Sequence, residues 1–271
     1  MKLSEVVKLL SEAGVDSPRE DARRLFSHFE GTPLHALIAE DPTTENGELI
    51  NAIRQRAERV PLQYILGEVE FYRETYRVTP DCLIPRSDTE ALVDYAVKNL
   101  KRGARILDLC CGSGCIAVST LSNTRDTRAV AADISDGALS IAEYNAKLNK
   151  VGERVEFLQL DVLSDDIPDW GKFDAILSNP PYVSDSVYST LAPEIFSEPR
   201  AAFLGGEDGG DFYRAITPRF LPYLAEDGFI AYEIGYDQSE LLLNIADSCD
   251  MVAEIIRDLS GNPRVAVLKR K

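Results

Sequence analysis

The sequence predicts a doubly wound α/β domain that ends in an antiparallel hairpin and is preceded by a small helical bundle. Three observations support this fold class. Short helical patterns, each ended by glycine or proline, fill the first 67 residues. From residue 105 onward, apolar strands alternate with helical segments, which is typical of a parallel sheet. Two late apolar segments, 253–257 and 264–268, flank the turn sequence Ser-Gly-Asn-Pro, which predicts an antiparallel pair.

The N-terminal region carries apolar residues at helical spacing. Four helices are predicted, at 3–13, 18–30, 32–38 and through 53–60. Between Glu68 and Pro85 the apolar residues change to the alternating period of a hairpin. We therefore assign residues 1–67 to a helical domain, 68–84 to a hairpin linker and 85–271 to the α/β domain.

The α/β domain shows five candidate parallel strands separated by helical segments. They are predicted at 105–109, 129–133, 155–160, 173–178 and 228–233. Crossovers of this kind place helices on both faces of the sheet. The expected fold is therefore a doubly wound sheet.

The chain is strongly acidic, with 29 Lys and Arg against 45 Asp and Glu and a formal charge of -16. Such a charge repels phosphate backbones and anionic lipid, which disfavours direct nucleic-acid or membrane partners. No segment approaches the roughly 20 apolar residues of a membrane span. The N-terminus becomes acidic at Glu5 before any long apolar run, so we expect no targeting peptide and a cytoplasmic location.

Cysteine and histidine are few. The five cysteines include the cluster Cys110, Cys111 and Cys115, and an odd number in a large chain favours buried reduced thiols over disulfides. The two histidines, His28 and His35, lie far away in the helical region. We therefore expect neither a metal site nor chemistry that depends on histidine.

A glycine-containing loop, Asp108-Leu-Cys-Cys-Gly-Ser-Gly114, follows the first predicted strand. Glycines let the backbone approach a ligand, and the next helix offers free N–H groups. Asp133 ends the second strand, where an acidic side chain can accept hydrogen bonds from both hydroxyls of a ribose. These features predict a nucleoside site that includes Asp133 and the loop residues Cys110, Cys111, Gly112, Ser113 and Gly114.

The glycine spacing does not exclude a dinucleotide, because Ala117 at the third position is tolerated. Asp108 favours another ligand, since a carboxylate there would repel a pyrophosphate but suits the ammonium group of an amino-acid tail. We therefore predict S-adenosyl-L-methionine as the cofactor. Asp161, at the end of the third strand, is placed either to accept from the adenine amino group or to cap a helix. Val162 is placed to pack on the adenine ring.

The tetrapeptide Asn179-Pro-Pro-Tyr182 follows the fourth strand, at the sheet edge where ligands bind. The Asn179 side-chain oxygen and the Pro180 carbonyl can each accept one N–H of a planar amide or amine, which aims that nitrogen at a methyl carbon. Pro180 and Pro181 fix the backbone, and Tyr182 covers the flat face of the substrate group. The sequence therefore predicts Asn179, Pro180 and Tyr182 as catalytic and all four residues as substrate-binding. Asn179 also borders the cofactor.

Further segments occur in a recognisable order along the chain. They are Pro61-Leu-Gln-Tyr-Ile-Leu-Gly67, Leu83-Ile-Pro-Arg-Ser-Asp-Thr-Glu90, Glu198-Pro-Arg200 with Gly205-Gly206, and Asp258-Leu-Ser-Gly261. Together with the Asn179 motif, they make nearly the whole chain resemble the PrmC/HemK family of peptide chain release factor glutamine N5-methyltransferases. The resemblance is more specific than the tetrapeptide alone.

The resemblance implies a Rossmann-like class I S-adenosylmethionine-dependent methyltransferase fold. The implied reaction methylates the side-chain amide of the glutamine in the Gly-Gly-Gln loop of bacterial class I release factors, leaving S-adenosyl-L-homocysteine. The helical domain would dock the release factor, and we expect a monomer. The sequence departs from the family pattern in two ways: Cys110 and Cys111 replace a Gly-Thr pair, and Val162 stands where an aromatic residue can stack on adenine.

Other readings remain open at this stage. A sister enzyme methylates a glutamine of a ribosomal protein, and N6-adenine or N2-guanine nucleic-acid methyltransferases use a similar clamp. A further alternative is a non-catalytic adaptor that binds release factor. Arg86 and Glu90 could border the cofactor or simply cap a helix. The stretch 198–210 could be a mobile flap or a surface loop.

Overall fold

The computed structural model describes residues 1–164, 166–258 and 260–271, and it divides the chain into two compact units. The first comprises residues 1–68 together with 192–197, and the second comprises 69–191 and 198–271. The sequence analysis placed 192–197 in the α/β domain. These residues pack with the N-terminal unit because Glu194 pairs with arginines there.

The N-terminal unit is a helical bundle. Its α-helices are α1 (Leu3–Glu12), α2 (Pro18–Glu30), α3 (Gly47–Ala57) and α4 (Leu62–Leu66). Their apolar faces meet in a core that includes Leu10, Phe26 and Ile53. The helix predicted at 32–38 is wrong: only one 3-10 turn forms, at Ala36–Ile38. Only Leu37 of that turn is buried, and Ile38 is 68% exposed, so no apolar face stabilises a longer helix.

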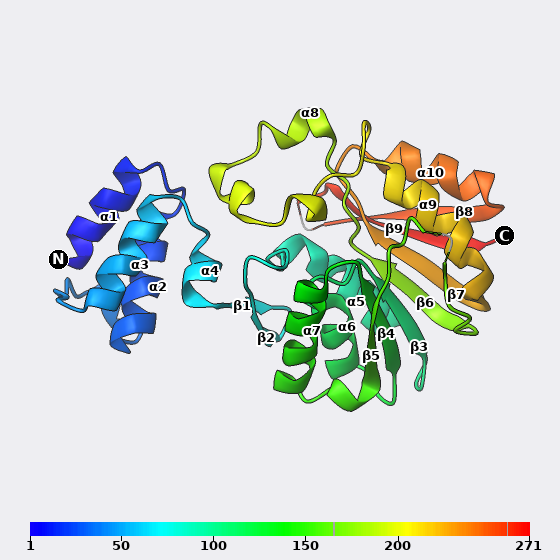
Figure 1. Cartoon of the computed structure of the whole chain (residues 1–271), viewed down its shortest axis with the longest axis horizontal. Helices are drawn as coiled ribbons and strands as arrows, with labels where there is room; N and C mark the ends of the chain where they lie inside the picture. The colour runs from blue at the N-terminus through cyan, green and yellow to red at the C-terminus, as the bar shows by residue number, and fades with distance from the viewer. Residues whose placement is uncertain (165, 259) are drawn as a thin grey trace. The chain divides into compact units, whose positions relative to one another are not determined.

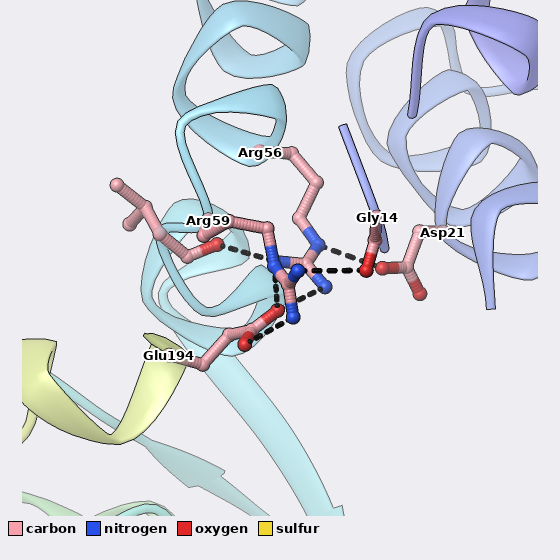
Figure 2. A network of polar contacts seen from close by, with 6 residues as sticks. Gly14, Asp21, Arg56, Arg59 and Glu194 are labelled. Carbon is pink, nitrogen blue, oxygen red and sulfur yellow. Dashed lines mark hydrogen bonds and ion pairs between the residues drawn. The ribbon is translucent and has the colours of Figure 1, made fainter. Parts of the chain in front are cut away.

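A polar network within this unit centres on the Arg56 guanidinium, whose side chain is only 7% exposed (Figure 2). Its Nε donates to Asp21 at 2.7 Å and one terminal nitrogen donates to Glu194 at 3.0 Å. Arg59 grips the same Glu194 carboxylate with two nitrogens, at 2.6 and 2.7 Å, and donates to the Gly14 carbonyl. The network fastens residues 192–197 to α2 and α3.

The second unit begins with a two-stranded hairpin, β1 (Glu68–Phe71) and β2 (Glu74–Arg77), of which only Glu68 groups with the first unit. Phe71 and Tyr76 of this hairpin are fully buried in the core of the second unit. The Tyr76 hydroxyl lies 2.5 Å from Ser119 Oγ. The hairpin is therefore part of the second unit's packing as well as a connection.

The main sheet has seven strands in the order β5-β4-β3-β6-β7-β9-β8 (Figure 1). The strands are β3 (Arg105–Leu109), β4 (Arg128–Asp133), β5 (Val155–Gln159), β6 (Phe173–Ser178), β7 (Leu224–Glu233), β8 (Met251–Arg257) and β9 (Pro263–Arg270). The pairs from β5 to β7 are parallel, whereas β9 runs antiparallel to both of its neighbours. The predicted doubly wound sheet and terminal hairpin are confirmed.

Helices cover the sheet in two groups, each with its own apolar core (Figure 1). The first group is α5 (Glu90–Asn99), α6 (Cys115–Ser122) and α7 (Asp136–Leu148). The second is α9 (Asp211–Phe220) and α10 (Ser239–Ser248), while the short α8 (Asp185–Tyr188) lies in the loop after β6. None of the helices described in the structure is long and apolar enough to cross a bilayer.

The chain direction across the sheet reverses at β3. From β3 the chain adds β4 and β5 on one side, then returns to add β6 and β7 on the other. Ligands of doubly wound sheets bind at such a switch point, beyond the carboxyl ends of the strands. The segments after β3 and β6 therefore frame the expected site, and Ser178 Oγ joins them by donating to the Leu109 carbonyl at 2.7 Å.

Candidate active site

A cavity of about 370 Å³ lies within the second unit beside the ends of β3, β4, β5 and β6. Most of the residues predicted for the site line it. These are Cys110, Cys111, Gly112, Ser113, Asp133, Asp161, Val162, Asn179 and Pro181. Asp108, Gly114, Pro180 and Tyr182 are not among the lining residues. The cavity brings together the glycine loop, two strand-end carboxylates and the Asn179 motif.

The loop after β3 adopts left-handed backbone conformations at alternate positions. Cys110, Gly112 and Gly114 have φ of +57°, +53° and +78°. A Cβ on Gly112 would meet no atom within 4 Å, so its Cα faces open space, whereas a Cβ on Gly114 would press on Ala142 of α7 at 3.0 Å. Gly112 thus keeps the backbone accessible and Gly114 allows close helix packing.

Asp133 is bound to the backbone on both of its carboxylate oxygens. Oδ2 accepts from Gly112 N at 2.8 Å, and Oδ1 accepts from Ser135 N at 3.0 Å. Burial raises the pKa of Asp133, while these backbone hydrogen bonds lower it. Each oxygen keeps a further lone pair, so the oriented carboxylate can still accept from hydroxyl groups in the cavity.

Asp108 lies fully buried at the end of β3, behind the cavity wall. Its Oδ2 accepts from Ala117 N at 3.0 Å, and its Oδ1 has no hydrogen-bond partner among the described residues. Burial raises the pKa of Asp108 to about 8, although the Ala117 hydrogen bond opposes this. An unpaired buried acceptor is costly and favours a cation or donor nearby.

Asp161 and Val162 begin a turn after β5. Asp161 Oδ1 accepts from Leu163 N at 2.9 Å, and its carbonyl accepts from Ser164 N at 3.0 Å, so the side chain caps a turn; the described residues between here and β6 contain no helix. Val162 is buried and packs in the core that includes α9 and α10. Both side chains nevertheless line the cavity.

The motif after β6 is held by two residues that the sequence analysis did not single out. Asn179 Nδ2 donates to Thr89 Oγ1 at 3.3 Å, and the Tyr182 hydroxyl donates to Glu233 Oε1 at 3.1 Å. Thr89 precedes α5, and Glu233 ends β7, the strand next to β6. Glu233 could have been suspected from the sequence, because it is an acidic residue at the end of a buried strand.

A glycine-rich segment braces the same motif. A Cβ on Gly205 would fall 2.6 Å from the Pro181 carbonyl, and one on Gly209 would fall 2.2 Å from the Tyr182 carbonyl. Gln238 Nε2 donates to the Tyr182 carbonyl at 3.0 Å and to the Gly209 carbonyl at 3.3 Å. The segment 205–209 is therefore packed directly against the motif's backbone.

Glu198 lies in a buried position beside the cavity. It accepts from Ile84 N at 2.9 Å and pairs with the Arg86 guanidinium. Burial raises the pKa of Glu198, and Arg86 opposes that shift. Arg86 lines the cavity, while Glu90 accepts from Tyr72 N at 2.7 Å and so anchors the hairpin β1–β2. Arg86 therefore borders the cavity, whereas Glu90 holds the hairpin.

The thiols near the cavity are free, and burial raises the pKa of Cys110, Cys111 and Cys115. They are therefore protonated and poorly nucleophilic. Across the described ranges, no group of three His, Cys, Asp or Glu side chains could hold a metal ion. The polar lining of the cavity provides amide, hydroxyl and carboxylate groups together with the Arg86 guanidinium.

Comparison with known proteins gives matches along the whole chain. Residues 2–67 match the PrmC N-terminal domain family, and residues 87–224 match the methyltransferase small domain family. The release factor glutamine methyltransferase of Geobacter sulfurreducens is 39% identical over 87% of this chain and 84% of its own. That of Thermodesulfovibrio yellowstonii is 38% identical over 92% of both chains.

Two solved methyltransferase structures have a fold similar to that of this chain. The ribosomal protein L11 methylase of Lactobacillus delbrueckii subsp. bulgaricus aligns with a TM-score of 0.52 and 22% identity, over 72% of this chain and 85% of its own. The hMettl16 catalytic domain aligns with a TM-score of 0.57 and 12% identity, over 82% of this chain and 79% of its own. They show the fold alone. The two sequence relatives, at 38–39% identity over most of both chains, place this protein in the release factor glutamine methyltransferase family.

Proposed function

We propose that this protein transfers a methyl group from S-adenosyl-L-methionine to the side-chain amide nitrogen of the Gly-Gly-Gln glutamine in bacterial class I release factors. The product would be S-adenosyl-L-homocysteine. The observation that carries the proposal is the position of Asn179, which lines the same cavity as Gly112 and Asp133 in a chain of this family.

The cavity residues fit this cofactor. Gly112 presents open backbone, Asp133 holds an oriented carboxylate suited to ribose hydroxyls, and Asp161 and Val162 line the cavity, where they would border the adenine. Asp108, which lies behind the lining residues, has an Oδ1 atom without a partner among the described residues, and an ammonium group nearby would favour the ionised form of this carboxyl group. When bound, S-adenosylmethionine supplies an electrophilic methyl group on a positively charged sulfur.

The chain's own residues would act on the glutamine amide. Asn179 Nδ2 is engaged by Thr89, so Asn179 Oδ1 and the Pro180 carbonyl can each accept one amide N–H. These two acceptors fix the nitrogen in line with the methyl carbon and stabilise the positive charge that develops on it. In the transfer, the C–N bond would replace the C–S bond, S-adenosyl-L-homocysteine would leave as the thioether, and one amide proton would pass to solvent water. Neither step needs histidine or a metal.

The helical unit is proposed to dock the release factor, with the second unit as the catalytic domain. The match of residues 2–67 to the PrmC N-terminal domain family supports a distinct role for that unit. A release-factor substrate would place the enzyme in the cytoplasm. The monomeric state stays a prediction, which light scattering with and without release factor would test. The absence of nucleic acid and membrane as partners also stays a prediction.

The deciding experiment uses labelled S-adenosylmethionine with a purified release factor and with its Gln→Ala loop variant. We expect label on the first and none on the second. Label on both, or on neither, contradicts the proposal. Ribosomal protein and DNA or RNA in parallel reactions test the alternative substrates directly.

Asn179→Ala should lower turnover by about 1,000-fold or more while cofactor affinity stays within about twofold, because the lost acceptor acts on the substrate nitrogen. Asn99→Ala is the matched control, since Asn99 lies exposed at the end of α5 and bonds only to its own helix at Tyr95. Methylation assays and calorimetric cofactor titration measure both quantities. Near-normal turnover in Asn179→Ala would remove Asn179 from the mechanism.

A further inference from the structure

Beneath the Asn179 motif lies a buried pair, Thr89 and Glu233. Each residue is only 2% exposed. Thr89 Oγ1 donates to Glu233 Oε2 at 2.5 Å, although the two residues are 144 positions apart in sequence. The pair lies wholly in the second unit and joins the segment before α5 to the end of β7.

This pair contacts both polar side chains of the motif. Asn179 Nδ2 donates to Thr89 Oγ1, and the Tyr182 hydroxyl donates to Glu233 Oε1. A single carboxylate therefore lies at the end of two hydrogen-bond paths, one from Asn179 through Thr89 and one directly from Tyr182. The two motif residues are fixed relative to each other through Glu233.

The direction of these hydrogen bonds sets the orientation of the Asn179 amide. A threonine hydroxyl has one proton, and Thr89 gives it to Glu233. Thr89 can then only accept, so Asn179 must turn its NH2 group toward Thr89. The Asn179 carbonyl oxygen consequently faces the opposite way, and no hydrogen bond within the described residues occupies it. An amide turned by 180° would place two acceptors together.

Both side-chain oxygens of Glu233 accept from hydroxyl groups. Burial raises the pKa of Glu233, while the hydrogen bonds from Thr89 and Tyr182 and the nearby charge of Arg264 lower it, and Asp88 opposes Arg264. Arg264 pairs with Asp88 at 3.2 Å and Asp258 at 3.6 Å rather than with Glu233. Glu233 is therefore left to bond hydroxyl groups.

We propose that Thr89 and Glu233 are positioning residues that orient the Asn179 amide and the Tyr182 ring for methyl transfer. This inference rests on the proposed function, because it assigns the Asn179 oxygen to the substrate N–H. Neither residue need touch the glutamine. Their effect passes through Asn179 and Tyr182.

The test compares three variants of the full chain. Thr89→Val keeps the shape and removes the hydroxyl, and Thr89→Ser keeps the hydroxyl. Thr217→Val is the control, because Thr217 is also a fully buried threonine of the second unit and its hydroxyl lies 3.0 Å from Tyr232 Oη, away from the motif. For each variant, kcat, cofactor affinity and unfolding free energy are measured.

We expect Thr89→Val to lower kcat by about 10- to 100-fold, the range in which small misplacements of a catalytic group act. Cofactor affinity should change by less than about twofold. Thr89→Ser should recover kcat to within about threefold of wild type, and Thr217→Val should lose stability without losing kcat. Wild-type kcat in Thr89→Val, or an equal loss in Thr217→Val, overturns the inference.

A second readout separates this inference from the proposed function. The Asn179 side-chain NH2 resonance should shift in Thr89→Val but not in Thr217→Val, because only the first removes its acceptor. If the wild-type protein failed to methylate any release factor, the proposed function would fall, while this resonance would still report on the orientation. An unchanged resonance in Thr89→Val contradicts the positioning role.

Discussion

Glu194 in the N-terminal unit and Glu233 in the catalytic unit are two carboxylates with opposite kinds of partner. Glu194, whose side chain is 18% exposed, accepts from the guanidinium groups of Arg56 and Arg59. Burial raises the pKa of Glu194, but the hydrogen bonds from the two arginines outweigh it and lower the pKa overall. The side-chain carboxylate of Glu233 bonds only hydroxyl groups among the described residues, and burial leaves its pKa raised.

The two carboxylates therefore suit different roles: Glu194 holds a segment in place, and Glu233 orients side chains. An arginine neutralises a carboxylate and holds it with parallel hydrogen bonds, so the Glu194 cluster is suited to keep residues 192–197 on the helical bundle. A hydroxyl leaves the charge in place but dictates which partner donates. The Glu233 arrangement therefore costs stability and gives direction to the Asn179 side chain.

The largest stability effect should come from the arginine cluster. Arg56→Met should lower the unfolding free energy by about 3 kcal/mol, because it leaves the buried Asp21 carboxylate unpaired. Arg54→Met is the control on the same helix, where the arginine is exposed, and it should change stability by less than about 0.5 kcal/mol. Urea unfolding measures both. Equal losses of unfolding free energy in the two variants would show that the buried ion pairs of Arg56 add no more stability than an exposed arginine.

The same isosteric change, Glu to Gln, should mainly lower kcat at Glu233 and mainly lower stability at Glu194. Glu233→Gln should lower kcat by about 30-fold, equivalent to about 2 kcal/mol, because an amide can accept from only one of its two hydroxyl partners. Glu194→Gln should keep kcat within about threefold and lower stability instead. If Glu194→Gln lost as much turnover as Glu233→Gln, the distinction between the two regions would be wrong.

The pH dependence of stability should differ in sign between paired and unpaired carboxylates. The folded-state pKa of Asp108, about 8, lies above its ordinary 3.8, so its contribution to stability falls as pH rises between these values. Asp108→Asn should therefore gain on wild type by up to about 1.4 kcal/mol per pH unit from pH 5 to 8. For Glu194 the pKa is lowered, so its contribution is present above 4.5 and lost on acidification.

Denaturant unfolding at pH 5, 6, 7 and 8 measures the Asp108 effect, with Glu194→Gln as the comparison variant. The stability difference between Glu194→Gln and wild type should be constant across this range and should disappear in acid. A pH-independent difference for Asp108→Asn would mean that its carboxyl group does not titrate as its burial implies.

The smallest effect concerns the strained loop. Cys110 has φ of +57°, a conformation that costs a residue with a Cβ about 1 kcal/mol or more. Cys110→Gly should therefore be about 1 kcal/mol more stable than Cys110→Ala. At Cys249, where φ is -102°, the same pair should show the reverse order. Thermal unfolding of the four variants decides between backbone strain and a general effect of glycine.

Much of the fold could be predicted because its determinants are local. The apolar strands from 105 to 178 were placed within one residue of β3, β4, β5 and β6, since helices separate β3, β4 and β5. The helical segment predicted between β5 and β6 is not found among the described residues there. The failures depended on distant contacts. The segment 32–38 lacks a second buried residue to support a helix, and Pro193–Ser197 joins the N-terminal unit through the side chain of Glu194.

The site divides in the same way. The glycine loop, Asp133 and Asn179 follow strand ends, so their meeting in one cavity follows from sheet topology. Thr89 and Glu233 could not be paired from the sequence, because 144 residues separate them and their hydrogen bond depends on tertiary packing. Tyr182 was expected to face the substrate, and a single sequence could not show that its hydroxyl bonds Glu233.

The position of β9 has a consequence for synthesis of the chain. Residues 263–270 follow every other strand in sequence, yet they lie between β7 and β8 and pair with both. While the polypeptide emerges from the ribosome, β7 therefore has one open edge, and β8 has no partner in this sheet, until β9 appears. Glu233 pairs with Val265 across that edge. β9 thus completes the sheet edge beside Glu233, so a nascent enzyme should become active only after residues 263–270 have been made.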